Sequence, residues 1–458
     1  MANRALPFRR AGRLPAEGPP ATEPAPGARG LLGVTVAGWL GNALSYLLLL
    51  AAARRLNTAD YGELVTLLNL LLIGSVPSFA LQAVAARRVA TGTADGLLAA
   101  GSLVGLAAAA LIAVLSPALV AFLHLPGPAG PLLVALSMPG TALQGLCQGV
   151  WQGEQRLTGL AVATFVGTAG RSGAGLAGLL AGGTSTSAVA ALAVGVSLPA
   201  AGCVLALPEL RRPSPGLFSR RPAEEQAPSQ QASSQRPSLR HRPLLSVVVE
   251  ASHASHAYGV FLLLSVSDVL LARHVLSTPA AAVYAAGSVL TKASLWLPQS
   301  VANVLFASLT DTDRHHRVFA RAVAGLAGLG LALVTGSWLL GGPVTGVVGG
   351  GSYPQLRADA WLFALLGSCL AVLQFTLVAG LAVRNVMVTA LIWAGVAGEA
   401  VLALSLGPHP SVRLVIALMA GLNLLIAAAA VLLRLAPRYR QSAGPGQPTA
   451  QLDSATGH

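Results

Sequence analysis

Long apolar runs, separated by short polar segments, follow one another along almost the whole chain. Each run has about 20 residues or more, and an α-helix of that length crosses a hydrocarbon core of about 30 Å. Transmembrane β-strands would instead alternate apolar and polar residues over about 10 positions. The pattern therefore predicts an all-α membrane protein with helices over residues 31–53, 63–86, 96–123, 131–152, 158–180, 187–209, 244–272, 281–306, 318–342, 358–381, 386–405 and 411–434.

Composition agrees with this interpretation. Hydrophobic residues make up 54% of the chain and charged residues 10%, with a mean hydropathy of +0.67, whereas soluble domains carry about 25% charged residues. The three cysteines, Cys147, Cys203 and Cys369, all lie inside apolar runs and follow no metal or disulfide spacing. We therefore expect buried thiols, and neither a metal nor another cofactor.

The positive charges indicate an orientation. If the N-terminus is cytoplasmic, the cytoplasmic segments hold 22 of the 29 Arg and Lys residues. The outer segments hold five, Arg54, Arg55, Arg273, Arg357 and Arg413. Because cytoplasmic loops are enriched in Arg and Lys, both termini are predicted to be cytoplasmic. Anionic lipids then account for the formal charge of +13, and the basic residues form no nucleic-acid motif.

Three polar segments divide the chain. Residues 1–30 and 435–458 are expected to be disordered cytoplasmic tails, and residues 210–243, rich in Pro, Ser, Gln and Arg, a flexible cytoplasmic linker. The linker separates an N-terminal lobe, 31–209, from a C-terminal lobe, 244–434. AARRLNTADYGE after the first run parallels LARHVLSTPAAAVYAAG after the seventh, so the lobes are predicted to form a parallel pseudo-repeat. Such repeats indicate a transporter with its substrate bound near the midplane.

The eighth predicted span carries a polar stripe that contains the only lysine of the chain. Ser288, Lys292, Gln299 and Asn303 fall on one face of a helix. A charge this deep in a bilayer costs at least about 2.5–3.5 kcal/mol, so it should meet a partner. Two interpretations stay open for Lys292: a cavity cation that binds an anionic substrate, or an ion pair with Asp268 or Glu399.

A second cation, Arg171, lies at a similar depth in the fifth span, and the fourth span presents Gln144 and Gln148 on one face. Two cations near mid-depth suit a ligand that carries phosphates, although a structural role for Arg171 is equally open. Single polar residues such as the glutamines also occur in plain helix packing.

Acidic and histidine residues of the C-terminal half are candidates for gating or ion coupling, namely Asp268, Glu250, His253 and Glu399. Asp268 lies near the outer end of its helix, where it could reach water. The angle between Glu250 and His256 on a helix is too wide for one metal site, and no catalytic arrangement stands in a sizeable extramembrane region. An enzyme is therefore not expected.

Three segments resemble the bacterial polysaccharide flippases. These are SDVLLARHVLSTPAAAVYAAGSVLTKASLWLPQSVANVLF (267–306), AARRLNTADYGELVTLLN (52–69) and GVWQGEQRLTG (149–159). The family has an "Asp, apolar, Leu, Pro, Gly-Leu-Tyr-Ala-Ala" run, an "Ala-Arg-x-Leu, Pro-x-Tyr-Gly" element and a "Gln-Gly-x-x-Arg" turn. This chain departs from it at Thr58, where proline is usual, and at Ala282 and Val283 before Tyr284.

The resemblance implies the fold of the multidrug, oligosaccharidyl-lipid and polysaccharide exporters, with two six-helix lobes around a central cavity that opens alternately to each side of the bacterial cytoplasmic membrane. Cargo would be a polyprenyl-diphosphate-linked oligosaccharide that moves to the outer leaflet for cell-surface polysaccharide biosynthesis. The chain is expected to act as a monomer, with a polysaccharide polymerase or glycosyltransferases as candidate partners.

Other functions stay open beside this one. A drug antiporter of the same fold would be expected to show a compact acidic site, and the first six runs contain no Asp or Glu near mid-depth. A major-facilitator carrier would show a Gly-x-x-x-Asp-Arg-x-Gly pattern, which AARRVATGTADG lacks. A transport-silent scaffold that acts through its tails is the alternative outside transport.

Overall fold

The structure is a computed structural model that describes residues 28–92, 94–207, 243–306, 315–349, 353–381, 386–407 and 410–435. Every regular element in these residues is an α-helix. Some side chains within the helices, including those of 243–255 and 297–306, are not among the described ones. The tails and almost all of the linker predicted from the sequence lie outside the described residues.

Seven helices form the first lobe. The second crossing is split at Ser75, and Pro77 lies at the start of its second half, where a proline, which has no N–H to donate, is tolerated. The helices are α1 (Ala28–Arg55), α2 (Thr58–Gly74), α3 (Val76–Ala90), α4 (Leu97–Leu123), α5 (Ala129–Gly153), α6 (Leu157–Gly182) and α7 (Ser185–Ala206).

Seven further helices form the second lobe. One of them, α11, has only 9 residues and links two full crossings. The helices are α8 (Pro243–Val275), α9 (Thr278–Phe306), α10 (His315–Leu339), α11 (Gly341–Gly349), α12 (Leu356–Leu381), α13 (Val386–Ser405) and α14 (Val412–Leu435). With α2 and α3 counted as one crossing, each lobe crosses six times. The prediction of twelve membrane helices in two lobes is confirmed, with boundaries shifted by about five residues at most.

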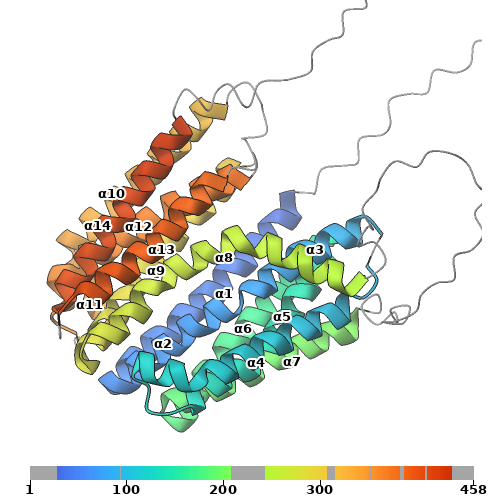
Figure 1. Cartoon of the computed structure of the whole chain (residues 1–458), viewed down its shortest axis with the longest axis horizontal. Coiled ribbons are helices and arrows are strands. Elements are labelled where there is room, and N and C mark those ends of the chain that lie inside the picture. Colours follow the sequence, from blue (N-terminus) through green and yellow to red (C-terminus); the bar gives the residue numbers. More distant parts are fainter. Residues whose placement is uncertain are drawn as a thin grey trace, which may run out of the picture.

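The two ends of the bundle need names. We call the end where α1 starts and α14 ends the proximal end, and the end where α1 leads into α2 the distal end. The ribbons of the two lobes meet at the distal end and spread apart toward the proximal end (Figure 1). Two contacts that join the lobes at the distal end are a hydrogen bond from Arg54 to Val347 O, 3.1 Å, and the ring pair Tyr61 and Tyr353, 5.9 Å between centroids.

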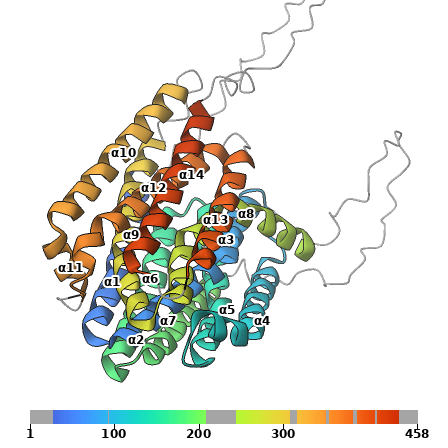
Figure 2. The same cartoon turned by 60° about the vertical axis from the view of Figure 1, so that its left-hand side comes forward.

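The long helix α8 connects the two lobes along its length. Its first half packs against α3 of the first lobe (Figure 2), where Tyr258 meets Phe79 edge to face at 5.6 Å. Its second half packs against α13 and α9 of its own lobe. When one lobe moves against the other, α8 must therefore either bend or lose its contacts with one of the lobes.

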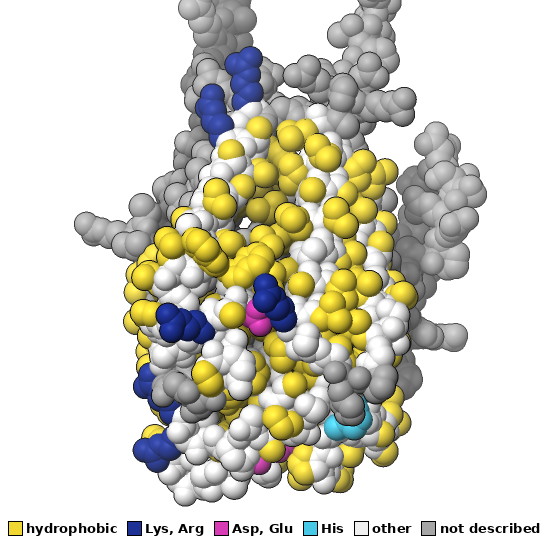
Figure 3. Space-filling model, turned by 90° about the vertical axis from the view of Figure 1, so that its left-hand side faces the viewer, with side chains coloured by type: hydrophobic (Ala, Val, Ile, Leu, Met, Phe, Trp, Pro, Cys, Tyr) yellow, Lys and Arg dark blue, Asp and Glu magenta, His cyan; other side chains and the backbone are white. Residues whose placement is uncertain are grey.

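The outer surface suits a lipid environment. Ten helices in the described part are long and apolar enough to cross a membrane, and hydrophobic side chains cover much of the face in Figure 3. Val114 is 77% exposed and Leu404 62% exposed, which lipid tails can cover. The helices that carry Arg171 and Lys292, α6 and α9, are not among the ten. They belong to the same bundle, because α6 packs on α1 and α7, and α9 packs on α12.

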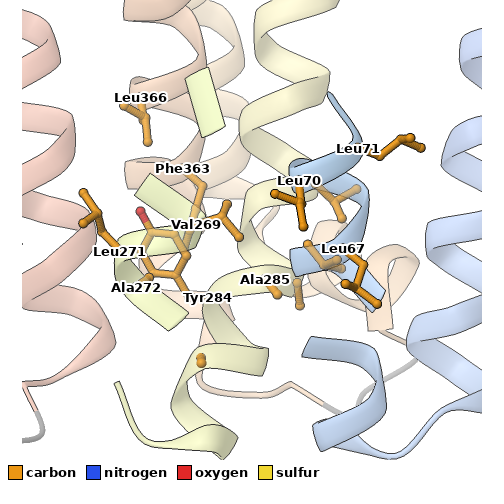
Figure 4. Close-up of a cluster of buried hydrophobic side chains, with 14 of the residues drawn as sticks. Leu67, Leu70, Leu71, Val269, Leu271, Ala272, Tyr284, Ala285, Phe363 and Leu366 are labelled. Atoms are coloured by element: carbon orange, nitrogen blue, oxygen red, sulfur yellow. The ribbon is translucent and has the colours of Figure 1, made fainter. Parts of the chain in front are cut away.

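A continuous apolar cluster joins the two lobes. Leu67 and Leu70 of α2 lie toward Ala285 of α9 and Val269 of α8 (Figure 4), and all four belong to one buried cluster. The ring of Tyr284 meets Phe363 of α12 at 5.2 Å. This core places the polar side chains described next on its borders.

Candidate functional site

The lysine on α9 points toward α8 of its own lobe. Lys292 Nζ donates a hydrogen bond to the backbone oxygen of Ser265 and interacts electrostatically with Asp268 and Glu399. The side chain is half-buried. Ser288, one turn before it, is buried and donates to Ala285 O within its own helix, so its hydroxyl is already satisfied. Asp268 and Glu399 are therefore near enough to act on Lys292 electrostatically, while the hydrogen bond of its ammonium in the described part of the chain goes to the backbone of Ser265.

Asp268 on α8 is buried rather than open to water. It is only 2% exposed, and Tyr284 donates a hydrogen bond from its hydroxyl to Oδ2 at 3.1 Å. The other oxygen, Oδ1, is buried and finds no hydrogen-bond partner in the described part of the chain. The sequence-based suggestion that this carboxyl could simply reach water is wrong, because α9 and its tyrosine cover it.

Glu399 on α13 is the second carboxyl of this group. It is fully buried and lies between α8 and α14. Ser267 donates to Oε2, and the side-chain amide of Asn423 donates to Oε1 at 2.6 Å. The second lobe thus holds one ammonium and two carboxyls, contributed by α8, α9 and α13, which we call the buried charge cluster: Asp268, Lys292 and Glu399.

Sequence reasoning had not selected Ser267, Asn423 or Tyr284, which complete this cluster. Asn423 carried a usable signal, because it is the only amide in the span 411–434 and lies near its middle. Ser267 and Tyr284 carried none, since a serine or tyrosine in an apolar helix usually reflects packing.

Arg171 on α6 is the contrasting cation of the first lobe. Its side chain is half-buried, and none of the described residues forms a hydrogen bond or ion pair with it. Two neighbours on the same helix face α1, where Ser172 lies 2.7 Å from Ser45 and Thr168 lies against Gly41. Arg171 is therefore a cation in a membrane helix that lacks a protein anion among the described residues.

The predicted glutamines lie on the neighbouring helix. A Cβ placed on Gly167 of α6 would lie 1.2 Å from Gln144 Nε2, so only glycine leaves room for this amide. Gly167 is one helical turn before Arg171, which puts Gln144 and Arg171 on adjoining parts of the same α6 face. Gln148 follows one turn further along α5 and is half-buried. Gln144 thus lies against α6 one helical turn from Arg171, in the first lobe, whereas Lys292 belongs to the second.

Two charged residues near the distal end were not among the candidate site residues of the sequence analysis. Glu63 of α2 is 5% exposed and accepts a hydrogen bond from Ser185 Oγ at 2.8 Å. Arg273, counted among the outer charges, is also only 5% exposed. Arg273 interacts electrostatically with Glu63. Nothing in their sequence neighbourhoods distinguishes them from ordinary loop charges.

Four predicted residues lie outside the described side chains. The backbones of Gln299 and Asn303 belong to α9, and those of Glu250 and His253 to α8, but their side chains are not described. In the described part of the chain, no three His, Cys, Asp or Glu side chains come together in a group that could hold a metal ion.

Comparison with known proteins places the fold among transporters. No family model and no curated sequence matches the chain. Among solved structures, the lipid II flippase MurJ in an inward closed conformation aligns with a TM-score of 0.68 at 10% identity, over 88% of this chain and 87% of that one.

Two further transporter structures share the arrangement. An inward-facing multidrug resistance MATE family transporter of the MOP superfamily aligns with a TM-score of 0.61 at 14% identity, over 91% and 98% of the two chains. A MOP superfamily transporter from Pyrococcus furiosus Vc1, described as having a binding pocket of reverse polarity, aligns with a TM-score of 0.52 at 14% identity, over 91% and 96%. At these identities the likeness shows the fold alone, which this chain shares with these solved structures.

Proposed function

We propose that this chain, which has the fold of the MOP-superfamily transporters, flips a polyprenyl-diphosphate-linked oligosaccharide from the cytoplasmic to the outer leaflet. Lobes that meet at one end and spread apart at the other suit alternating access, in which a central site opens to each side in turn. The work would take place in the bacterial cytoplasmic membrane, with both termini cytoplasmic. It would support the synthesis of a cell-surface polysaccharide.

Arg171 carries the proposal. A guanidinium inside a membrane helix costs at least about 2.5–3.5 kcal/mol on insertion scales unless an anion meets it. The described residues provide no such anion, whereas a diphosphate presents oxygens in the geometry that a guanidinium binds with two parallel hydrogen bonds. Gln144 on the adjoining surface could donate a further hydrogen bond, with Gln148 beyond it. Arg171 therefore has the chemistry and the environment of a diphosphate ligand.

Lys292 would have two alternating partners, the carboxyls of its own lobe and the substrate. It already interacts with Asp268 and Glu399, yet its side chain keeps some exposure. We assign it to the site as a cation that exchanges between the carboxyls of its own lobe and the substrate diphosphate. Ser288 before it and Gln299 and Asn303 after it share this helix face and would contact the sugar-diphosphate portion.

The buried charge cluster offers a means of coupling. Two carboxyls near one ammonium have a surplus of negative charge when all three are ionised, so a proton or another cation would bind there. Binding of the diphosphate by Lys292 would then change the affinity of Asp268 and Glu399 for that cation. Gating or ion coupling by these residues, and by Glu250 and His253 on α8, belongs to this proposal.

A drug or small-molecule antiporter of the same fold is the second candidate. Its supporting observation is the set of buried carboxyls, Glu63, Asp268 and Glu399, which could attract cationic substrates. The two candidates differ in the charge of the cargo. A transport-silent scaffold, by contrast, would act through the tails and linker and would move neither cargo.

A translocation assay distinguishes these functions. Purified protein in liposomes would be supplied with a labelled polyprenyl-diphosphate oligosaccharide, and the fraction accessible to a membrane-impermeant reagent would be followed over time. We expect faster translocation than in protein-free liposomes, and no uptake of a cationic dye driven by a proton or sodium gradient. Dye uptake without lipid translocation would favour the antiporter, and the absence of both would favour the scaffold.

The proposed partners follow from the membrane location of the protein. The protein would act as a monomer in a membrane with anionic lipids, and a polysaccharide polymerase or glycosyltransferases would use or supply its cargo. Neither nucleic acid nor a cofactor is part of the proposal.

A further inference from the structure

The distal end of α4 leaves three carbonyl groups that need donors. The last carbonyls of an α-helix have no partner within the helix and carry its partial negative charge. α4 ends at Leu123, and His124 follows in the left-handed conformation with φ 48°. The oxygens of Phe122, Leu123 and His124 are therefore available at this end.

The donors come from the other lobe. At the end of α8, Arg273 donates from Nε to Leu123 O at 3.1 Å and from Nη2 to His124 O at 3.3 Å. His274 lies with Nδ1 2.8 Å from Phe122 O, so this nitrogen carries the proton. The imidazole also stacks on the Phe122 ring, with centroids 4.2 Å apart and planes at 10°. Side chains of the second lobe thus cap a helix of the first.

The guanidinium is held on its remaining side by α2. Arg273 is 5% exposed, and its Nη1 is buried without a hydrogen-bond partner in the described part. A Cβ on Gly62 would lie 3.1 Å from Nη1, so the glycine lets the guanidinium approach the backbone of α2. The carboxyl of Glu63, the next residue, interacts with it electrostatically. Burial of this charge is offset only while the two lobes are together.

Solvent reaches the edge of this contact. A cavity of about 440 Å³ is lined by His124, Arg273 and His274, by the turn between α8 and α9, and by the end of α13. Water can therefore replace the carbonyl partners as soon as the lobes begin to separate. The contact can release without stranding its donors in an apolar environment.

From these contacts we propose that Arg273 and His274 form a latch that keeps the distal end closed, and that transport requires its release. We call these two residues, with the carbonyls of Phe122, Leu123 and His124, the distal latch. Its part in transport rests on the proposed alternating access, but its effect on opening does not. A weaker latch raises the fraction of molecules that are open at the distal end.

The test measures opening directly, without a substrate. Ala282 of α9 is fully buried, and its Cβ would lie 3.5 Å from a Cβ built on Gly62 of the other lobe. Ala282→Cys, in a chain whose three native cysteines are replaced by alanine, therefore places a thiol in the closed distal interface. The rate of its reaction with a membrane-impermeant maleimide in nanodiscs then reports the open fraction.

Arg273→Gln is expected to raise this rate about tenfold or more, since bonds from a charged group to two carbonyls are lost. Arg273→Lys keeps the positive charge but loses the planar guanidinium that reaches both carbonyls, so it should give an intermediate rate. Arg55→Gln is the matched control, because Arg55 is an exposed arginine at the same end, and its rate should stay within about twofold of the parent. A rate for Arg273→Gln within twofold of the parent, at unchanged thermal stability, would overturn the latch.

A second variant covers a failure to fold. If Arg273→Gln does not yield folded protein, His274→Ala removes the bond to Phe122 O and the ring stack, and should raise the rate severalfold. An unchanged rate for this variant also overturns the latch. A faster maleimide reaction in the variants, together with no translocation of lipid-linked sugar by the wild-type protein, supports the latch and rejects the flippase function. An unchanged rate in a protein that does translocate the lipid rejects only the latch.

Discussion

At the scale of single residues, the two intramembrane cations differ in their surroundings although the sequence presents them alike. Lys292 lies beside two carboxyls of its own lobe, while Arg171 has no anion among the described residues. Depth in the span was predictable for both from the lengths of the apolar runs. Their neighbours were not, because Asp268 and Glu399 come near Lys292 only through the packing of α8 against α9 and of the distant helix α13 against α8.

Lys292→Gln should destabilise the protein by leaving Asp268 and Glu399 without their cation. Breaking a fully buried pair costs about 3–5 kcal/mol, and since Lys292 is only half-buried we expect about 2 kcal/mol. Adding Asp268→Asn should restore part of this loss, with a coupling energy of about 0.5–3 kcal/mol. Thermal unfolding of the two single variants and the double variant in detergent measures the coupling. Strictly additive effects would show that Lys292 and Asp268 do not interact.

At the scale of the elements, the apolar periodicity predicted nearly all of the helix boundaries. There are two exceptions: the break between α2 and α3, which Pro77 follows, and the short helix α11, which begins at the end of the predicted span 318–342 and occupies part of the interval before 358–381. Contacts between helices were not predictable in the same way. Gly167, for example, is one of 51 glycines, and only the structure shows that it makes room for Gln144.

Gly167→Ala should weaken the packing of α5 on α6. The new methyl group would overlap the amide of Gln144, and overpacking of this kind costs about 1–3 kcal/mol. Gly173→Ala on the same helix is the matched control, because its Cβ would meet Leu44 at an ordinary 3.7 Å and should be tolerated. Thermal stability of both variants gives the answer. A double variant, Gly167→Ala with Gln144→Ala, should recover stability; if it does not, the overlap is not the cause.

At the scale of the whole molecule, the two six-helix lobes could be predicted from the sequence and the conformation could not. Closure of the distal end depends on contacts such as Arg273 with α4, and these arginines look like loop charges in the sequence. Arg54, Arg55 and Arg273 lie at the distal end of the bundle, and the assignment of this end to the outer side stays a prediction from the distribution of Arg and Lys.

Reporter fusions test this topology. The charge distribution of 22 to 5 predicts that reporters at Gly127 and Gly350 read outside, and that reporters at Gln230 and Gln441 read inside. Enzymatic reporters that are active on only one side of the membrane make the measurement. Two or more reversed reporters would contradict the orientation.

The linker should be dispensable for folding and transport. Its composition cannot bury a core, so replacing residues 214–238 with a Gly-Ser chain of equal length should leave expression and export unchanged. Export of the surface polysaccharide and protein abundance would be measured together. Loss of export at normal abundance would instead favour the scaffold function.

The most direct test of the account is the translocation rate of a labelled polyprenyl-diphosphate oligosaccharide by the wild-type protein and by Arg171→Gln, in liposomes of matched protein density. Arg171 has no anion among the described residues, so its removal strands none of their carboxyls and the variant should keep its thermal stability. We predict a translocation rate at least about tenfold lower, because a hydrogen-bonded charge pair with the diphosphate is lost. The exposed Arg156→Gln serves as the control and should match the wild type. Equal rates for Arg171→Gln and the wild type would contradict the proposed diphosphate site.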